Sequence, residues 1–201
     1  MEVKKIEYID ELHLYLVNGV ITPSVTQLLQ KKFPNKYTGI PARILEEKCK
    51  FGNSVHEFIE MVSRGETPSL DNYPIHERLC CEQFLKLQKN HSIHSLRNEM
   101  LIHYKDKYCG RLDLIALIDD MYCLCDVKTT AKLDEEYLKY QLGLYYYALK
   151  EMGFVDIVDF DKFIAIWLPK KELGKLIEIS KLTQEEFDEF MKEFVYESDS
   201  E

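Results

Sequence analysis

Two aspartates and a lysine interrupt apolar segments near the middle of the 201-residue chain. Asp113 lies within GRLDLIALI, and Asp126 and Lys128 lie within CLCDVKTT. A folded chain seldom buries charged side chains unless they have partners. Carboxylates can hold a divalent metal ion that activates water, and a nearby ammonium group can offset developing negative charge. These three residues are therefore the first candidates for a catalytic site.

The acidic pair Asp119–Asp120 predicts how the two aspartates meet, because it separates two strand-like segments. A hairpin turn centred there places Asp113 opposite Asp126, and Arg111 opposite Lys128. Two carboxylates about 5 Å apart repel each other. Mg²⁺ or Mn²⁺ between them would balance that charge better than a lysine alone. The alternative is a structural Lys128–Asp126 ion pair, with Asp113 hydrogen-bonded to the backbone.

Composition limits the other functional classes. The formal net charge is −9, which by itself does not indicate nucleic-acid binding. The chain has no run of about 18 apolar residues and no signal-peptide pattern at its first residues, so we expect a cytoplasmic protein without membrane contact. The six cysteines include no C-x-x-C pair, and we expect reduced, buried thiols and no iron–sulfur cluster.

Hydrophobic periodicity and turn residues predict alternating helices and strands. The expected elements are a hairpin turning at Asn18–Gly19, a helix entered at Ser24–Thr26, a helix from Pro41 to about Lys50, a helix from Gly52–Ser54 to Gly65, a helix at 75–90, strands near 97–104, 108–118 and 121–128, a helix at 133–153, a strand at 162–169 and a helix begun by a Thr183–Glu186 capping box.

This order predicts an α/β fold. We expect a mixed β-sheet, made of a three-stranded meander, a crossover helix and a fourth strand, with helices on both faces and an N-terminal β-hairpin. One domain should span residues 1–201. Within it, 1–50 would form the hairpin and helices, 51–170 the catalytic core, and 171–201 a C-terminal helix with a frayed acidic tail.

The motifs resemble a known superfamily when taken in order. GRLDLI followed by CDVKTT resembles the metal-binding core of PD-(D/E)XK nucleases. FGNSVHEFIE, with Gly52 and His56, resembles the G-x-x-x-H helix of the RecB-like and phage-exonuclease branch, and YQLGLYYYAL, with Gln141 and Tyr145, resembles its Q-x-x-x-Y helix. Glu99 matches an acidic position on the preceding strand, and NGVITPSVTQLL is similar to the start of phage nucleases of this type.

The resemblance implies a restriction-endonuclease-like fold and a role for each matching residue. The implied metal ligands are His56, Glu99, Asp113, Asp126 and the carbonyl of Val127. Lys128 would orient or deprotonate the attacking water, and Gln141 and Tyr145 would support the site. Without the resemblance, His56, Glu99, Gln141 and Tyr145 are ordinary packing or surface residues.

DNA contacts are expected from residues around this site. The expected DNA-binding residues are Arg111, Thr129 and Lys132, and the wider set of candidates for a basic groove is Lys31, Lys32, Lys36, Arg43, Arg111, Lys132 and Lys139. The negative net charge requires such a groove to be basic only locally, with bound metal offsetting the carboxylates.

The expected activity is metal-dependent hydrolysis of DNA. An exonuclease acting on linear duplex or single strands in phage-type recombination, repair or replication is favoured, in the host cytoplasm if the chain is phage-encoded. An endonuclease on the same scaffold and a non-catalytic DNA-end-binding module are the alternatives. A single-strand annealing or recombination protein is a compatible partner, and so is a second copy of the chain. Cleavage polarity and strand preference stay open.

Overall fold

Two β-sheets and the helices around them make up the computed structural model, which describes residues 5–9, 14–154 and 159–196. The N-terminal sheet is antiparallel, with strands β1 (Ile6–Ile9), β2 (Leu14–Val17) and β3 (Val20–Thr22). The main sheet has the order β4-β5-β6-β7-β8, with strands β4 (His94–Tyr104), β5 (Tyr108–Ile118), β6 (Met121–Lys128), β7 (Lys162–Trp167) and β8 (Lys175–Ile179). The predicted acidic tail from residue 197 onward lies outside the described residues.

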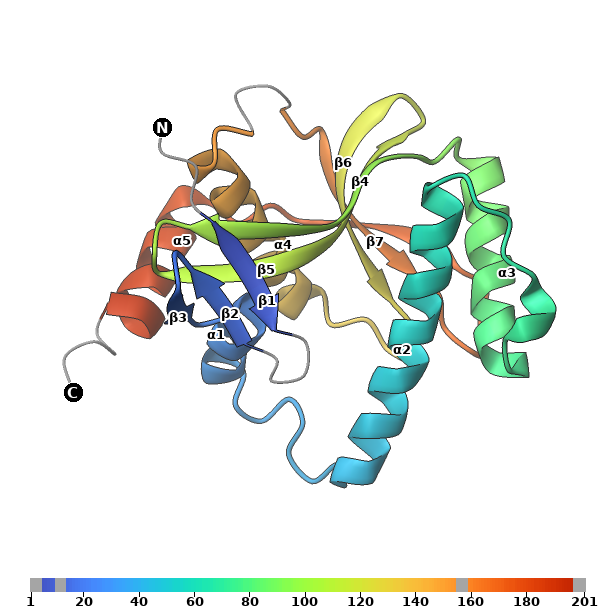
Figure 1. The fold of residues 1–201 in the computed structure, drawn as a ribbon, viewed down its shortest axis with the longest axis horizontal. Coiled ribbons are helices and arrows are strands. Elements are labelled where there is room, and N and C mark those ends of the chain that lie inside the picture. The colour runs from blue at the N-terminus through green and yellow to red at the C-terminus, as the bar shows by residue number, and fades with distance from the viewer. Residues whose placement is uncertain (1–4, 10–13, 155–158, 197–201) are drawn as a thin grey trace.

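The helices connect and cover these sheets (Figure 1). They are α1 (Val25–Lys32), α2 (Ala42–Ser63), the 3₁₀ turn η2 (Leu70–Asn72), α3 (Ile75–Asn90), α4 (Glu135–Glu151), α5 (Gln184–Met191) and the π-helical turn η3 (Lys192–Tyr196). None of the helices in the described part of the chain combines the length and apolar character needed to cross a bilayer.

The register of the central hairpin agrees with the prediction. Asp119 and Asp120 form the turn with φ values of 48° and 65°, a left-handed conformation that Asp tolerates better than most residues. The strands pair outward from Ile118–Met121 to Leu114–Cys125. The pairing of β5 with β6 stops at Leu114–Cys125. The turn therefore sets the register only as far as this pair. The ladder does not include the predicted pairs of Asp113 with Asp126 and of Arg111 with Lys128, which lie just beyond its last pair.

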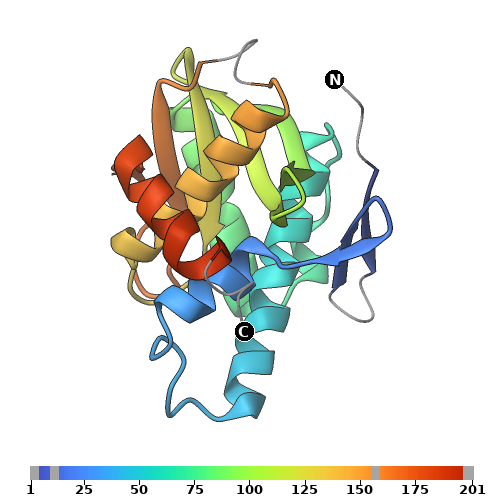
Figure 2. The same cartoon turned by 90° about the vertical axis from the view of Figure 1, so that its left-hand side faces the viewer.

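Helices cover both faces of the main sheet, as the alternation of apolar residues predicts. Leu114 and Ala116 of β5 pack in one buried cluster with residues of α2 and α3. Ile115, which points to the opposite face, packs in a second cluster with residues of α1, α4 and α5. Figures 1 and 2 show these two groups of helices on opposite sides of the sheet. The fold is therefore mixed α/β, with a parallel β6–β7 pair joined through α4.

Local capping signals confirm most of the predicted boundaries. Ser24 and Gln27 form a capping box at the start of α1, and Thr183 and Glu186 form another at the start of α5. The N-terminal hairpin turns at Asn18–Gly19, where both φ values are positive.

Three features of the fold differ from the prediction. Residues expected to form two helices, separated at Gly52, form the continuous helix α2, because Phe51 and Val55 belong to one buried stripe that outweighs a glycine cost of about 1 kcal/mol. The N-terminal hairpin gains a third strand, β1, and the main sheet gains β8 in a segment where only a helix and tail were predicted.

All six cysteines are free thiols, as expected. Five of them are buried, whereas Cys49 is exposed on α2, contrary to the expectation of burial. Burial raises the pKa of the Cys80, Cys81, Cys109 and Cys123 thiols to about 11 or 12, so these groups stay protonated at neutral pH. These four thiols therefore act as packing groups.

Gly143 allows α4 to pack directly against Leu182. A Cβ atom added at Gly143 would overlap the Leu182 side chain, with Cδ2 at 2.7 Å. Overpacking of this kind costs about 1–3 kcal/mol, which exceeds the roughly 1 kcal/mol that alanine gains in a helix. We therefore expect Gly143→Ala to lower the urea midpoint. Gly52→Ala is the matched control: its Cβ would meet only Thr129 Oγ1 at 3.8 Å, and it should raise the midpoint. Equal stabilisation by both changes would contradict this packing.

Candidate active site

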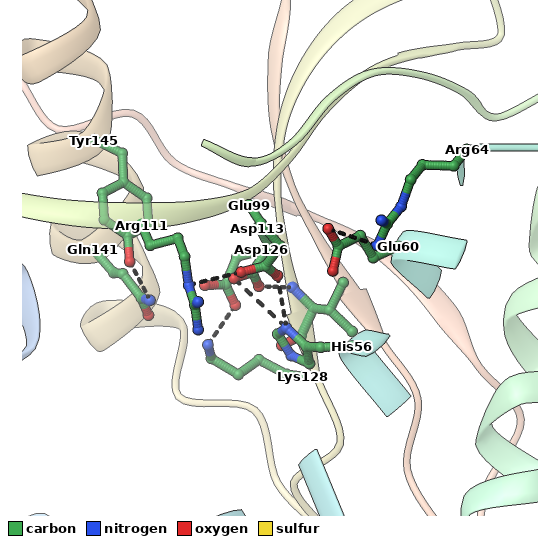
Figure 3. Close-up of polar contacts among 11 residues, drawn as sticks. His56, Glu60, Arg64, Glu99, Arg111, Asp113, Asp126, Lys128, Gln141 and Tyr145 are labelled. Atoms are coloured by element: carbon green, nitrogen blue, oxygen red, sulfur yellow. Dashed lines mark hydrogen bonds and ion pairs between the residues drawn. The ribbon is translucent and has the colours of Figure 1, made fainter. Parts of the chain in front are cut away.

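The candidate site lies at a fork in the main sheet (Figure 3). β5 stays paired with β4 to its first residue, but it pairs with β6 only as far as Leu114. Beyond that point β6 continues alongside β7. At the fork, Asp113 Oδ2 accepts a 2.8 Å hydrogen bond from the backbone N–H of Val127. The Asp113 side chain thus takes the place of the next backbone hydrogen bond between β5 and β6. Asp113 of β5 and Asp126 of β6 therefore both lie at the point where the two strands separate.

Glu99 reaches the fork from β4 through an unfavourable backbone conformation. Its φ is +47°, which is uncommon for a non-glycine residue and costs about 1–3 kcal/mol. The strand pairs on either side place Glu99 opposite Asp113. Its carboxylate is held at 2.8 Å by the Nε of Arg111. Backbone strain of this kind, together with a fixed carboxylate, is typical of functional sites.

His56 comes from α2 and completes a cluster with the two carboxylates. Its Nε2 lies 3.2 Å from the carbonyl oxygen of Val127, and its Nδ1 lies 3.7 Å from both Glu99 Oε1 and Asp113 Oδ1. A ligand atom from each of His56, Glu99 and Asp113 lies within 4.8 Å of the others. If Nε2–H donates to Val127, the Nδ1 lone pair faces the carboxylates. This is how a backbone carbonyl commonly orients a metal-binding histidine.

The charge state of His56 follows from its neighbours. Burial alone would lower its pKa, but the carboxylates of Asp113 and Glu99 outweigh burial and raise the pKa of His56 to about 9. At neutral pH the histidine of the metal-free protein is therefore a cation. A bound metal ion would take the place of that proton.

Asp126 is the most deeply buried acidic group of the site, with no exposed surface. Its Oδ2 lies 2.5 Å from the Nζ of Lys128, whereas its Oδ1 has no hydrogen-bond partner among the described residues. Burial raises the pKa of Asp126 to about 6, with Lys128 opposing the rise and Asp113 adding to it. A buried carboxylate oxygen without a partner is costly. The donor set therefore fits a further cation at this place.

Part of this arrangement agrees with the purely structural alternative. The Lys128–Asp126 ion pair is present, and Asp113 is bonded to the backbone. That alternative does not account for Glu99 and His56, which converge on the same point from two other elements. The buried Oδ1 of Asp126, which has no partner among the described residues, is also unexplained by a structural role.

The predicted metal ligands are only partly assembled. His56, Glu99 and Asp113 form one cluster, whereas Asp126 lies outside it and contacts Lys128. The Val127 carbonyl, expected to bind metal directly, faces the His56 ring instead. Its contribution in this conformation is to orient a ligand.

Gln141 and Tyr145 lie one turn apart on α4, on the face predicted from their spacing. Gln141 Nε2 donates to Tyr145 Oη at 3.1 Å, and both side chains are buried. They line a pocket of about 410 Å³ together with His56, Glu99 and Asp113. Burial raises the pKa of Tyr145 well above its usual range, so its phenol stays protonated. The phenol can donate its O–H to a ligand in this pocket.

The same pocket contains residues that sequence reasoning missed. Tyr8 of β1 and Tyr15 of β2 lie on its wall, as does the first turn of α1. The guanidinium of Arg111 lies 5.2 Å from the Tyr8 ring centroid, close enough for a cation–π contact. The alternating pattern of β1 could have identified a strand, but not that its sheet covers the site.

The predicted DNA-binding residues are separated in space. Arg111 lies in the pocket of about 410 Å³, bound to Glu99. Thr129 lines a second pocket beside Phe51, and Lys132 lines a third pocket beside Lys36.

The other groove candidates do not form a free basic surface. Most of them are engaged with acidic, aromatic or backbone partners: Lys31 with the Phe194 carbonyl, Lys32 with the Tyr140 ring, Lys36 with Asp134, Arg43 with Glu47 and Lys139 with Glu186. A basic groove made of these residues is therefore not preformed.

Comparisons with known proteins give little support for any assignment. No protein-family model matches the chain, and no curated protein matches it. Among solved structures, one titled "Crystal structure of SSO0001" is similar at 16% sequence identity over 83% of each chain, with a TM-score of 0.36. Similarity this low supports no conclusion about family or function, and the candidate site rests on its own geometry.

Proposed function

We propose that the chain is a metal-dependent deoxyribonuclease with a restriction-endonuclease-like core of the RecB-like PD-(D/E)XK type. One observation carries the proposal: His56, Glu99 and Asp113 converge at the fork of β5 and β6, beside the buried Asp126–Lys128 ion pair, in which Asp126 Oδ1 has no partner among the described residues. Such a set of one imidazole and several carboxylates suits Mg²⁺ or Mn²⁺.

The residues at the fork would have different roles in phosphodiester hydrolysis. His56, Glu99, Asp113 and, after release from Lys128, Asp126 would hold the metal. A metal ion held by these residues would supply activation of the attacking water and stabilisation of the leaving oxygen. Arg111 fixes the carboxylate of Glu99, and the backbone N–H of Val127 fixes that of Asp113.

Lys128 acts as a cation in this scheme. Burial opposes its charge, but the carboxylates of Asp126 and Asp113 raise its pKa above the usual value. At neutral pH it is therefore protonated in the metal-free protein. Its role is to offset charge on the scissile phosphate and to orient the attacking water.

An exonuclease acting on linear DNA in phage-type recombination, repair or replication is the favoured activity. The resemblance of the ordered motifs supports it, together with the partly enclosed pocket beside Gln141 and Tyr145. An endonuclease and a non-catalytic DNA-end-binding module remain the alternatives. A single-strand annealing partner, homo-oligomerisation and a cytoplasmic location belong to the same proposal and rest on the resemblance alone.

The direct test uses end-labelled linear DNA and closed circular DNA, each with Mg²⁺, Mn²⁺ or EDTA. We expect degradation of linear DNA alone, only with metal, and its loss in Asp113→Asn. Glu60→Gln is the matched control, because Glu60 lies on α2 one turn from His56 but forms its own ion pair with Arg64. Cutting of circles would favour the endonuclease. Cleavage that survives Asp113→Asn would exclude the assigned site, and DNA binding without any cleavage would favour the end-binding module.

A further inference from the structure

A second pocket lies beside the candidate active site, at the carboxyl ends of the parallel strands β6 and β7. The two strands end together: Lys128 pairs with Trp167, and the N–H of Leu168 donates to the Lys128 carbonyl at 2.7 Å. Both ends lie next to α2 (Figure 1). Ligands of α/β sheets often bind in the crevice outside the carboxyl ends of parallel strands. This position alone makes the pocket a candidate ligand site.

We define the β6–β7 pocket by its three sides: Lys48 and Phe51 of α2, residues 129–131 after β6, and residues 169–172 after β7. Its volume is about 340 Å³. Ala131 is exposed at the pocket, whereas Phe51 and Pro169 are largely buried and form its base. Lys170 covers the Phe51 ring, with its Nζ 3.6 Å from the ring centroid. A flat ring can stack on Phe51 only after this lysine swings away from it.

The charge around the β6–β7 pocket differs from that of the rest of the protein, which has a net charge of −9. Neither Lys48 nor Lys171 has a hydrogen-bond or ion-pair partner among the described residues. Lys170 contacts the Phe51 ring, and it has no carboxylate partner among the described residues. Glu172, the one acidic side chain lining the pocket, lies 3.5 Å from Lys175. Three cations around an apolar pocket complement a ligand that has both a flat ring and negative charge.

The β6–β7 pocket shares no lining residue with the candidate active-site pocket, but two elements, β6 and α2, lead from one to the other. Thr129 directly follows Lys128, and its Oγ1 lies 3.8 Å from the position of a Cβ on Gly52. Phe51 precedes His56 by five residues on α2, which is about 7.5 Å along the helix axis. The loop after β6 is itself held by a 2.8 Å hydrogen bond from Trp167 Nε1 to the Thr130 carbonyl. A strand with one phosphate at the active site would therefore reach this pocket with a neighbouring nucleotide.

We infer that the β6–β7 pocket takes an unpaired base of a DNA single strand, with the flanking phosphates against Lys48, Lys170 and Lys171. The inference rests on the proposed nuclease function and assigns it a substrate form, a strand with unpaired nucleotides beside the scissile bond. Apolar and aromatic surface that stacks a base, bordered by cations that follow the backbone, is the usual composition of single-strand binding sites. In duplex DNA the same base is stacked and paired, and does not enter.

The test fills the pocket without changing its charge. Ala131 is exposed at the pocket, so Ala131→Trp should fold and occupy the space of the base. Leu173→Trp is the matched control, because Leu173 is 76% exposed on the next loop and lies outside the pocket lining. Binding is measured by fluorescence anisotropy in EDTA, with an oligo-dT strand, an abasic strand of the same length and a blunt duplex. Unfolding midpoints of the variants check that each is folded.

We expect Ala131→Trp to weaken oligo-dT binding at least about fivefold, and binding of the abasic strand and blunt duplex less than twofold. The double change Lys170→Gln/Lys171→Gln should weaken both single strands and lower the salt dependence of binding. Leu173→Trp should change none of these. The inference is overturned if Ala131→Trp weakens binding of both single strands equally, or if it weakens neither. If Ala131→Trp does not fold, the Lys170→Gln/Lys171→Gln variant tests the phosphate contacts, and unchanged binding by that variant overturns the inference.

Failure of this inference differs from failure of the proposed function. If the wild-type protein cleaves linear DNA but Ala131→Trp binds oligo-dT like the wild type, the nuclease proposal stands and the base site is wrong. If the wild-type protein neither binds nor cleaves any DNA, both fail. Binding of an apolar peptide that Ala131→Trp abolishes, without an effect on oligo-dT, would assign the pocket to a protein partner instead.

Discussion

Lys128→Met should lower the rate of metal-dependent DNA cleavage by about 10²–10⁴-fold, the range associated with loss of a positioned proton-transfer or charge-stabilising group. Its Nζ contacts Asp126 at the fork, and its side chain is 25% exposed, so it can turn toward a substrate once metal binds the carboxylates. Two other cations lie near Asp113 in the metal-free protein, but Arg111 is held by Glu99, and His56 would lose its proton to bind the metal. Lys128 is therefore the cation able to move to the scissile phosphate.

The experiment compares single-turnover cleavage of linear DNA with metal-induced stabilisation of the same variants. Lys128→Met should keep the stabilisation by Mn²⁺, because it removes no metal ligand. Lys128→Arg should keep part of the rate, since the guanidinium retains the positive charge but is planar and larger than the ammonium group. Lys86→Met, at an exposed position on α3, is the matched control and should cleave like the wild type. Cleavage by Lys128→Met within tenfold of the wild type would contradict the assigned role.

The hairpin at the site was predictable because short-range rules determine it. Asp119 and Asp120 adopt the left-handed conformation that a two-residue turn requires, and the turn sets the register as far as Leu114. That register brings Asp113 and Asp126 to the same end of the hairpin. It does not reveal that pairing stops there, because β6 leaves β5 through its pairing with β7, a contact between distant segments.

Other parts of the site depend on contacts that no local pattern encodes. The positive φ of Glu99 contradicts its position in a strand and is maintained by surrounding structure. Tyr8 and Tyr15 reach the pocket because the N-terminal sheet packs beside β4 and β5. The basic groove was proposed from charge alone, and side-chain partners such as Asp134 for Lys36 could be found only in three dimensions.

The metal-free protein should lose stability as the pH rises from 5 to 9, and bound Mg²⁺ or Mn²⁺ should reverse this trend. Asp126 gives the first contribution. Burial raises its pKa from 3.8 to about 6, so between these values the folded protein keeps a proton that the unfolded chain has lost. Ionisation of Asp126 therefore costs the folded state, and this stability is lost as the pH rises from about 4 to about 6.

His56 contributes in the same direction at higher pH. Burial opposes its charge, but the carboxylates of Asp113 and Glu99 raise its pKa from 6.5 to about 9. A raised pKa means that the folded state favours the protonated imidazole. The stabilisation is therefore complete below pH 6.5 and disappears as the pH rises through about 9. A metal ion binds the deprotonated forms of His56 and Asp126, so its stabilising effect should grow over the same range.

The measurement is the urea midpoint at pH 5, 7.5 and 9, with EDTA or with millimolar Mn²⁺. Asp126→Asn should raise the metal-free midpoint at pH 7.5, because it removes the buried charge, and should abolish both the response to Mn²⁺ and DNA cleavage. The charge left on Lys128 reduces the gain but does not cancel it, because this side chain reaches solvent. Asp119→Asn is the matched control: its turn conformation suits asparagine, and the variant should respond to Mn²⁺ like the wild type. A metal-free midpoint that rises from pH 5 to 9 would contradict the cost assigned to the ionised forms of Asp126 and His56, and an Asp126→Asn variant that is still stabilised by Mn²⁺ would show that Asp126 is not a metal ligand.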